Sequence, residues 1–232
     1  MIFLANPTFL LFMTLALYAG GMWLSTKKKW IIFNPIILSM VILMGYLFIL
    51  DIPYANYEEA GHYIDFFLKP SIVVLAVPLY IQWEKIQKQL FPILFSQLVG
   101  CVVGVVSVVI LAKITGADQE IILSLAPKSV STPIALEISK SVGGIPSVTA
   151  AAVMIAGIFG SMVGFKVLNL TRISNPMSQG IAMGTSSHAM GTMKAMEVSD
   201  KYGAFASVGM IFNGIFTAIL APIILGLLSA YL

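Results

Sequence analysis

Charged residues are scarce in this sequence: they make up 10% of its 232 residues, whereas hydrophobic residues make up 59%. Soluble domains carry about a quarter charged residues, so this composition excludes an ordinary water-soluble globule. A single cysteine, Cys101, and two histidines, His62 and His188, argue against disulfides and against metal sites rich in these residues. There is no basic stripe with interleaved aromatics, which argues against a nucleic-acid partner. The short motifs of hydrolases, zinc proteases and nucleotide-binding enzymes are also absent. We therefore expect a membrane protein that is not an enzyme and uses neither a cofactor nor a metal.

The N-terminal stretch lacks the positive charge with which a signal peptide begins. No Lys or Arg precedes the positive run at 27–29, which follows the first apolar stretch. That order is typical of a first transmembrane helix with its N-terminus outside, not of a cleaved leader. The connection 51–65 is acidic and predicts the outside, whereas Lys85, Lys88 and Arg172 predict inner loops. The predicted location is the cell membrane, crossed several times.

Six apolar stretches are long enough to cross the hydrocarbon as helices, for which about 20 residues suffice. They cover residues 8–25, 33–50, 66–81, 91–112, 147–168 and 204–231. The predicted fold class is therefore all-α, with about six full transmembrane helices in one transmembrane domain over 1–232. Within it we expect peripheral helices in 1–65 and a core in 66–232.

Two further segments, 119–144 and 175–203, mix apolar residues with small polar and ionisable ones. In the first, Pro127 and Pro133 flank a Ser/Thr cluster, and proline removes a backbone donor and breaks a helix. Irregular backbone at membrane depth survives only where protein or a watery cavity satisfies it. Both segments are therefore predicted to be broken or re-entrant helices. Whether each turns back or crosses stays open.

The two segments also resemble each other at a fixed offset. Without gaps, Thr132, Ala135, Glu137, Ser139, Gly143, Ser147 and Val148 match Thr192, Ala195, Glu197, Ser199, Gly203, Ser207 and Val208. With alternating orientation of the spans, each segment and the helix after it would form inverted copies of one unit. Inverted repeats with interrupted helices are a recurring construction of secondary transporters.

Two polar clusters in these segments are candidates for binding a small anion. The substrate-binding candidates are Lys128, Ser129, Ser131, Thr132, Thr185, Ser186, Ser187, His188 and Thr192, and the helix-breaking candidates are Pro127, Pro133, Gly184 and Gly191. A bend that precedes a helix offers N–H groups and a positive dipole end to an anion, and Lys128 adds a full charge. The alternative is that the hydroxyls only cap the helix while Lys128 reaches an interface. Likewise, His188 either binds a carboxylate or shuttles a proton, or it is satisfied by a neighbouring carbonyl within tight packing.

Glu137 and Glu197 form a third candidate pair. An unpaired carboxylate in lipid is costly, so each should bind a cation or take up a proton. A role in proton coupling, together with His188, is one interpretation. A structural ion pair, for example with Lys140 or Lys201, is the other.

Four strings of the sequence resemble the LrgB/CidB family. They are FLKPSIVVLAVPLY, PKSVSTPIALEISKSVGGIPSVTA, RISNPMSQGIAMGTSSHAMGT and YGAFASVGMIFNGIFTAILAP, and the resemblance covers nearly the whole chain. That family includes bacterial proteins named for antiholin-like or holin-like control of murein hydrolases, and a domain of the plastidial glycolate/glycerate translocator. The resemblance implies a polytopic membrane protein, often beside a small LrgA/CidA-type membrane partner. For some members it implies transport of pyruvate, glycolate or glycerate.

The residues and the resemblance together give two hypotheses. The first is a secondary transporter of small monocarboxylates that works by alternating access. The alternative is a holin- or antiholin-like pore, or a regulator of murein hydrolase export and lysis. The expected partners are a small carboxylate, membrane lipid, an LrgA/CidA-type protein and further copies of the chain.

Overall fold

The computed structural model describes residues 4–27, 34–67, 70, 76–228 and 231, and within them the chain is helical without strands. The chain divides into two compact units, Met1–Val74 and Leu75–Leu232. The predicted all-α class is confirmed.

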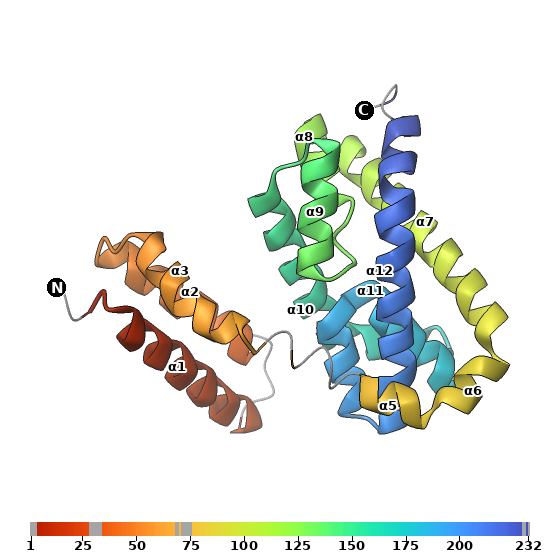
Figure 1. Ribbon diagram of the computed structural model, residues 1–232, viewed down its shortest axis with the longest axis horizontal. Helices are drawn as coiled ribbons and strands as arrows, with labels where there is room; N and C mark the ends of the chain where they lie inside the picture. The colour runs from red at the N-terminus through yellow and green to blue at the C-terminus, as the bar shows by residue number, and fades with distance from the viewer. Residues whose placement is uncertain (1–3, 28–33, 68–69, 71–75, 229–230, 232) are drawn as a thin grey trace. The chain divides into compact units, whose positions relative to one another are not determined.

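The N-terminal unit contains α1 (Pro7–Lys27), α2 (Pro35–Ile49) and α3 (Tyr54–Asp65), with α1 and α2 side by side (Figure 1). Asn34 begins α2, because its side-chain oxygen accepts a hydrogen bond from the Ile36 amide at 2.9 Å. Gly21 lets the two helices approach, since a Cβ at that position would lie 2.8 Å from the Cα of Pro35. The Tyr46 hydroxyl donates to the Leu4 carbonyl oxygen at 3.1 Å, which joins α2 to the start of the chain.

The C-terminal unit is arranged around its last helix. Its elements are α5 (Ala76–Ile81), α6 (Trp83–Lys88), α7 (Leu90–Ile114), α8 (Gln119–Leu125), α9 (Thr132–Val142), α10 (Pro146–Leu170), α11 (Pro176–Met196) and α12 (Asp200–Leu228). Helix α12 runs the length of the unit, with α8 and α9 near its C-terminal half and α5 near its N-terminal half (Figure 1).

Four of the predicted spans are long apolar helices in the structure: α1, α7, α10 and α12. The predicted span 33–50 is the 15-residue apolar helix α2. At 1.5 Å per residue, it is shorter than a hydrocarbon core of about 30 Å. The predicted span 66–81 includes residues 68–69 and 71–75, which lie outside the described residues, and α5 forms its end.

The distribution of polarity in the C-terminal unit suits a membrane. Large apolar side chains are exposed, among them Phe91 at 80% and Leu170 at 88%. Polar residues are buried instead, and these include Gln97, Ser124, Ser139, Thr149, Thr192, Ser207, Asn213 and Thr217. A water-soluble fold has the opposite preference. With its long apolar helices, the chain is a multi-pass membrane protein.

The first broken segment turns back on itself. Helix α8 ends at Leu125, residues 126–130 form turns and a bend, and α9 returns from Thr132. Gly143, with φ 84°, ends α9 in the left-handed conformation that favours glycine. The Ile145 amide then donates to the Ser124 hydroxyl at 2.7 Å, so the start of α10 lies beside α8.

The second broken segment turns back within α11. The backbone leaves helical geometry at Ser187 (φ −130°, ψ 15°) and His188 (φ 42°, ψ −134°). Both ends of α11 lie near the first turns of α12: a Cβ at Gly180 would lie 2.7 Å from the Tyr202 carbonyl oxygen, and one at Gly203 would collide with the Met196 side chain.

The break in α11 falls between the two glycines that the sequence suggested, not at either of them. Gly184 and Gly191 serve close packing instead. A Cβ at Gly184 would collide with the Ala206 carbonyl oxygen, and one at Gly191 with the Met183 carbonyl oxygen. The first segment breaks between Pro127 and Pro133, as expected, and Pro133 lies in the first turn of α9.

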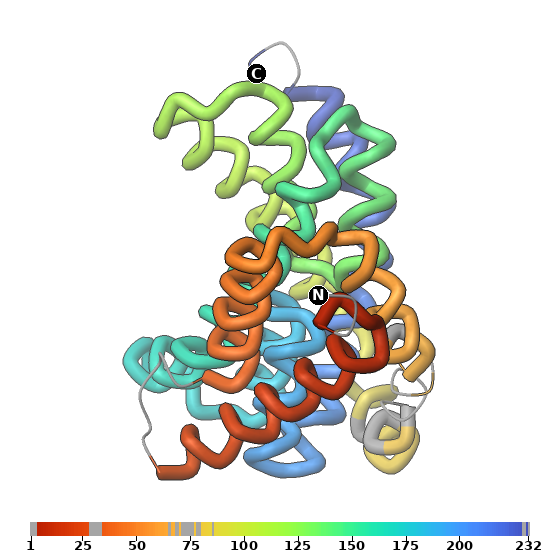
Figure 2. Tube along the Cα trace, turned by 90° about the vertical axis from the view of Figure 1, so that its left-hand side faces the viewer, coloured from red at the N-terminus to blue at the C-terminus, as the bar shows by residue number. Residues whose placement is uncertain are grey.

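The two broken segments reach α12 from opposite ends (Figure 2). At the offset of 60 residues, the start of α9 corresponds to the end of α11, and α10 corresponds to α12, whereas residues 137–142 of α9 correspond to the turn and the first residues of α12 at 197–202. This is the order that the offset of 60 residues predicts, and the opposite approach is what an inverted repeat requires.

Candidate functional site

The two broken segments meet at one side chain near the middle of α12. The Asn213 amide nitrogen donates to the Ser129 carbonyl oxygen at 3.2 Å and to the Thr185 carbonyl oxygen at 3.1 Å. Asn213 is 2% exposed. Each broken segment therefore has a carbonyl group, freed from regular helix geometry, satisfied by the same buried amide.

A cavity of about 220 Å³ lies at this meeting point. It is lined by Gly100, Cys101, Val103, Gly104 and Val105 of α7, Ala126, Lys128 and Ser129 of the first bend, Thr185 and Ser186 of α11, and Asn213 and Thr217 of α12. Four predicted substrate-binding residues thus share one cavity: Lys128, Ser129, Thr185 and Ser186.

Lys128 supplies the charge of the cavity. Its side-chain nitrogen donates to the Ser129 hydroxyl at 3.3 Å. Over the described residues the ion pairs are Glu137–Lys140 and Glu197–Lys194, so no described carboxylate neutralises Lys128. A half-buried ammonium among apolar helices is costly unless an anion or water compensates it. The cavity can therefore accept a small anion.

Besides Asn213, three polar residues at or beside the cavity are not among the site residues predicted from the sequence. The Cys101 thiol lies 3.3 Å from the Thr217 hydroxyl, and both residues line the cavity. Gln97, 1% exposed, accepts a hydrogen bond from the Thr185 hydroxyl at 2.9 Å. In the sequence, Gln97 and Thr217 could have been noticed only as single polar residues within apolar runs. That signal does not separate a cavity-lining residue from one that joins two helices.

His188 does not line the cavity and packs against α10 instead. Its Nε2 atom lies 2.9 Å from the Val153 carbonyl oxygen, and a Cβ at Gly157 would lie 2.5 Å from its ring. The neighbouring Ser187 is fully buried against Gly160 in the same way. This arrangement matches the second interpretation of His188, in which the ring is tightly packed and forms a hydrogen bond with a neighbouring carbonyl group.

The other hydroxyl candidates are divided between the interior and the surface. The Thr192 hydroxyl is buried and donates to the His188 carbonyl oxygen at 2.9 Å, as a hydroxyl within a helix often does. Ser131 is the residue before α9, yet its side chain forms no capping hydrogen bond. Thr132 and Pro133 are exposed at the start of α9. None of these residues borders the Lys128 cavity.

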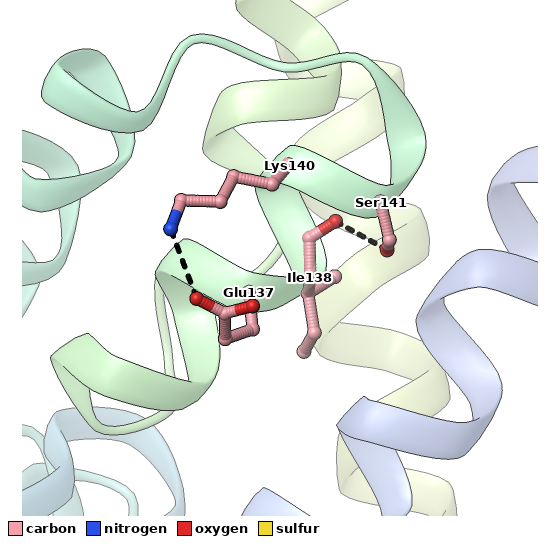
Figure 3. A network of polar contacts seen from close by, with 4 residues as sticks. All are labelled: Glu137, Ile138, Lys140 and Ser141. Atoms are coloured by element: carbon pink, nitrogen blue, oxygen red, sulfur yellow. Dashed lines mark hydrogen bonds and ion pairs between the residues drawn. The ribbon is translucent and has the colours of Figure 1, made fainter.

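The two glutamates are exposed and paired. Glu137 binds Lys140 at 3.0 Å, next to the Ser141 hydroxyl that donates to the Ile138 carbonyl oxygen (Figure 3). Glu197 pairs with Lys194, three residues earlier, rather than with Lys201. Both are ion pairs between residues three apart on mostly exposed side chains, which contribute little to stability. Neither glutamate borders the cavity.

Comparisons with known proteins match nearly the whole chain. A family model described as "LrgB-like family" matches residues 14–227. An uncharacterized protein of Haemophilus influenzae is 37% identical over 212 residues, which cover 90% of this chain and 92% of that protein. The antiholin-like protein LrgB of Bacillus subtilis is 34% identical over 225 residues, 97% of each chain. The antiholin-like protein LrgB of Bacillus mycoides is 33% identical over 218 residues, 94% of this chain and 95% of its own. No solved structure matches.

Proposed function

Because this chain belongs to the LrgB-like family, we propose that it is an antiholin-like protein of the cell membrane that regulates murein hydrolase export and lysis. The observation that carries this proposal is the length of the match. The Bacillus subtilis relative named antiholin-like aligns over 97% of both chains. Of the two hypotheses drawn from the sequence, the names of these relatives favour this one.

Complementation tests the proposal directly. A Bacillus subtilis strain without its antiholin-like LrgB would receive this chain, and the loss of optical density and the hydrolase activity on murein gels would be measured. We expect the chain to restore the parental lysis rate, and the exposed-surface variant Lys140→Ala to restore it equally. Lysis as fast as in the deletion strain, with the chain present in the membrane, would contradict the proposal. Co-expression with a small LrgA/CidA-type protein tests the proposed partner in the same strain.

A second candidate function is a carrier of small monocarboxylates such as glycolate, glycerate or pyruvate. The observation that favours it is the Lys128 cavity, with its uncompensated ammonium and hydroxyl groups from both broken segments. Its volume of about 220 Å³ is below the roughly 300–1,000 Å³ typical of drug-sized ligands, which suits a small acid. Two broken segments that meet in mid-bundle are the usual setting for alternating access.

Uptake by proteoliposomes separates the carrier from a pore. A carrier gives saturable uptake of radiolabelled acid and competition between similar acids, whereas a pore gives unsaturable leakage of unrelated solutes. We expect Lys128→Gln to abolish saturable uptake and the matched surface variant Lys140→Gln to keep it. Saturable uptake that Lys128→Gln leaves unchanged would remove the cavity from the mechanism.

A further inference from the structure

A groove of about 470 Å³ runs between α7 and α11 beside the Lys128 cavity. Ser96 and Gln97 lie on its α7 side, and Ser178 and Ala182 lie on its α11 side. These positions are in the first turns of both helices. The groove is therefore near the ends of α7 and α11 that begin at Leu90 and Pro176.

The groove and the Lys128 cavity are separated by very little protein. Three residues, Gly100, Thr185 and Ser186, line both spaces. The Thr185 hydroxyl lies 2.9 Å from the Gln97 side-chain oxygen and 2.7 Å from the Ile181 carbonyl oxygen of its own helix, so its single hydrogen is shared between two acceptors. Its methyl group faces Gly100, where a Cβ would lie 3.4 Å away. The partition is thus one interhelix hydrogen bond and one methyl–glycine contact.

A third space lies apart from both the groove and the Lys128 cavity. The space next to the outer half of α12 is lined by Pro133, Ile134, Glu137, Ile138, Ser141 and Ala218, and it shares no lining residue with the cavity. The end of the Ile134 side chain lies against Gly214, where a Cβ would be 3.1 Å from it. Of these two neighbouring spaces, the groove is the one that shares lining residues with the Lys128 cavity.

We propose that small anions reach Lys128 through the groove between α7 and α11, with the Gln97–Thr185 hydrogen bond as the gate. The groove begins where α7 follows the short helix α6, which ends at Lys88, and where α11 follows the connection that carries Arg172. Positive connections lie on the cytoplasmic side, so the route opens to the cytoplasm. The choice of small anions as the ligand rests on the proposed carrier function. The route itself can be measured without transport.

Cys101 makes the test possible in the unmodified protein, because this only cysteine of the chain lines the cavity. Right-side-out and inside-out vesicles would be treated with a membrane-impermeant, anionic methanethiosulfonate. The thiolate of Cys101 attacks the reagent, forms a mixed disulfide and releases methanesulfinate, and labelled protein is counted by mass. We expect faster modification in inside-out vesicles.

The gate is tested by removing its hydrogen bond. Gln97→Ala should raise the rate of Cys101 modification about fivefold, the factor that corresponds to one net hydrogen bond. Thr185→Val, similar in shape, removes the donor instead and should act in the same direction if Gln97→Ala does not fold. The matched control is Ser107→Ala, an exposed position on α7 whose hydroxyl bonds only to Gly104 of its own helix.

Charge is tested with a second reagent of similar size. Lys128→Gln should slow the anionic reagent and leave a neutral methanethiosulfonate unchanged, measured in detergent. Equal rates from both membrane sides, or rates that neither gate variant raises, would overturn the route. If Cys101 is labelled as expected but proteoliposomes show no saturable uptake, the route stands and the proposed carrier function is wrong.

Discussion

The amide nitrogen of Asn213 lies 3.2 Å from the carbonyl oxygen of Ser129, a residue 84 positions earlier in the chain. The same nitrogen also satisfies the carbonyl oxygen of Thr185. One side chain in the middle of α12 therefore joins two segments that approach from opposite ends. The cavity beside them depends on this link, because both lining bends are fixed by it.

Replacing Asn213 should loosen both bends. Asn213→Ala leaves two carbonyl groups in the interior without their donor, which we expect to lower the free energy of unfolding by about 1–3 kcal/mol. Denaturation in detergent, followed by circular dichroism, measures the change. Ser107→Ala on the exposed face of α7 should change it little. A variant as stable as the parent would show that water replaces the amide at no cost.

Replacing Gly157 should disturb the packing of His188. A Cβ at this position would lie 2.5 Å from the His188 ring and 2.7 Å from its Nε2 atom. We expect Gly157→Ala to destabilise the protein by about 1–3 kcal/mol, the usual cost of overpacking. Gly104→Ala is the matched control, since nothing lies within 4 Å of a Cβ there. In a double-mutant cycle with His188→Ala, the two changes should be strongly non-additive. Additive effects would place the clash elsewhere.

The backbone conformation of His188 predicts that His188→Gly is more stable than His188→Ala, the reverse of the order in a regular helix. With φ 42° and ψ −134°, it occupies a region that glycine adopts far more readily than other residues. Both His188→Gly and His188→Ala lose the contact with the Val153 carbonyl oxygen, but only glycine relieves the strain, worth about 1–3 kcal/mol. We expect His188→Gly to have the higher thermal midpoint. In a regular helix alanine would be the more stable by about 1 kcal/mol. A higher midpoint for His188→Ala would argue that the chain is helical at this position.

Removing the charge of Lys128 should not weaken the fold. The ammonium has no described carboxylate partner, so its burial is a cost that an apolar side chain avoids. Lys128→Met, which keeps the length of the side chain, is expected to raise the free energy of unfolding by about 1 kcal/mol. The measurement is denaturation in detergent, and Lys140→Met, which breaks only an exposed pair, should stay within about 0.5 kcal/mol of the parent. A large loss of stability in Lys128→Met would give Lys128 a structural role.

The sequence was sufficient for the long apolar helices and for the existence of the breaks. Residues 147–168 and 204–231 were predicted as spans, and the structure has helices at 146–170 and 200–228. Proline and left-handed glycine act locally, so the break at Pro127–Pro133 could be predicted from a few residues. The break at Ser187 and His188 could not be located in the same way. No local residue imposes it; it depends on the packing of His188 against Gly157 of another helix.

The candidate site was only partly accessible to sequence reasoning. Lys128 and Thr185 were predicted from their unusual polarity, and the structure brings them to one cavity. The same reasoning placed His188 and Glu137 among the candidates, although His188 packs against α10 and Glu137 pairs at the surface. Polarity in an apolar chain identifies a residue that needs a partner. It does not identify whether that partner is a ligand, a carbonyl group or a neighbouring lysine.

By itself, the sequence determined that this protein lies in a membrane and is helical. The scarcity of charged residues requires the membrane, and the long apolar runs must form helices there. Both conclusions depend only on which residues follow one another along the chain. Only the tertiary structure decided that both broken segments turn back, that they meet at Asn213, and that Gln97 rather than His188 stands beside the cavity. Those outcomes depend on which surfaces come within a few ångströms of one another. Residues 84 positions apart, such as Ser129 and Asn213, acquire that proximity only when the helices pack.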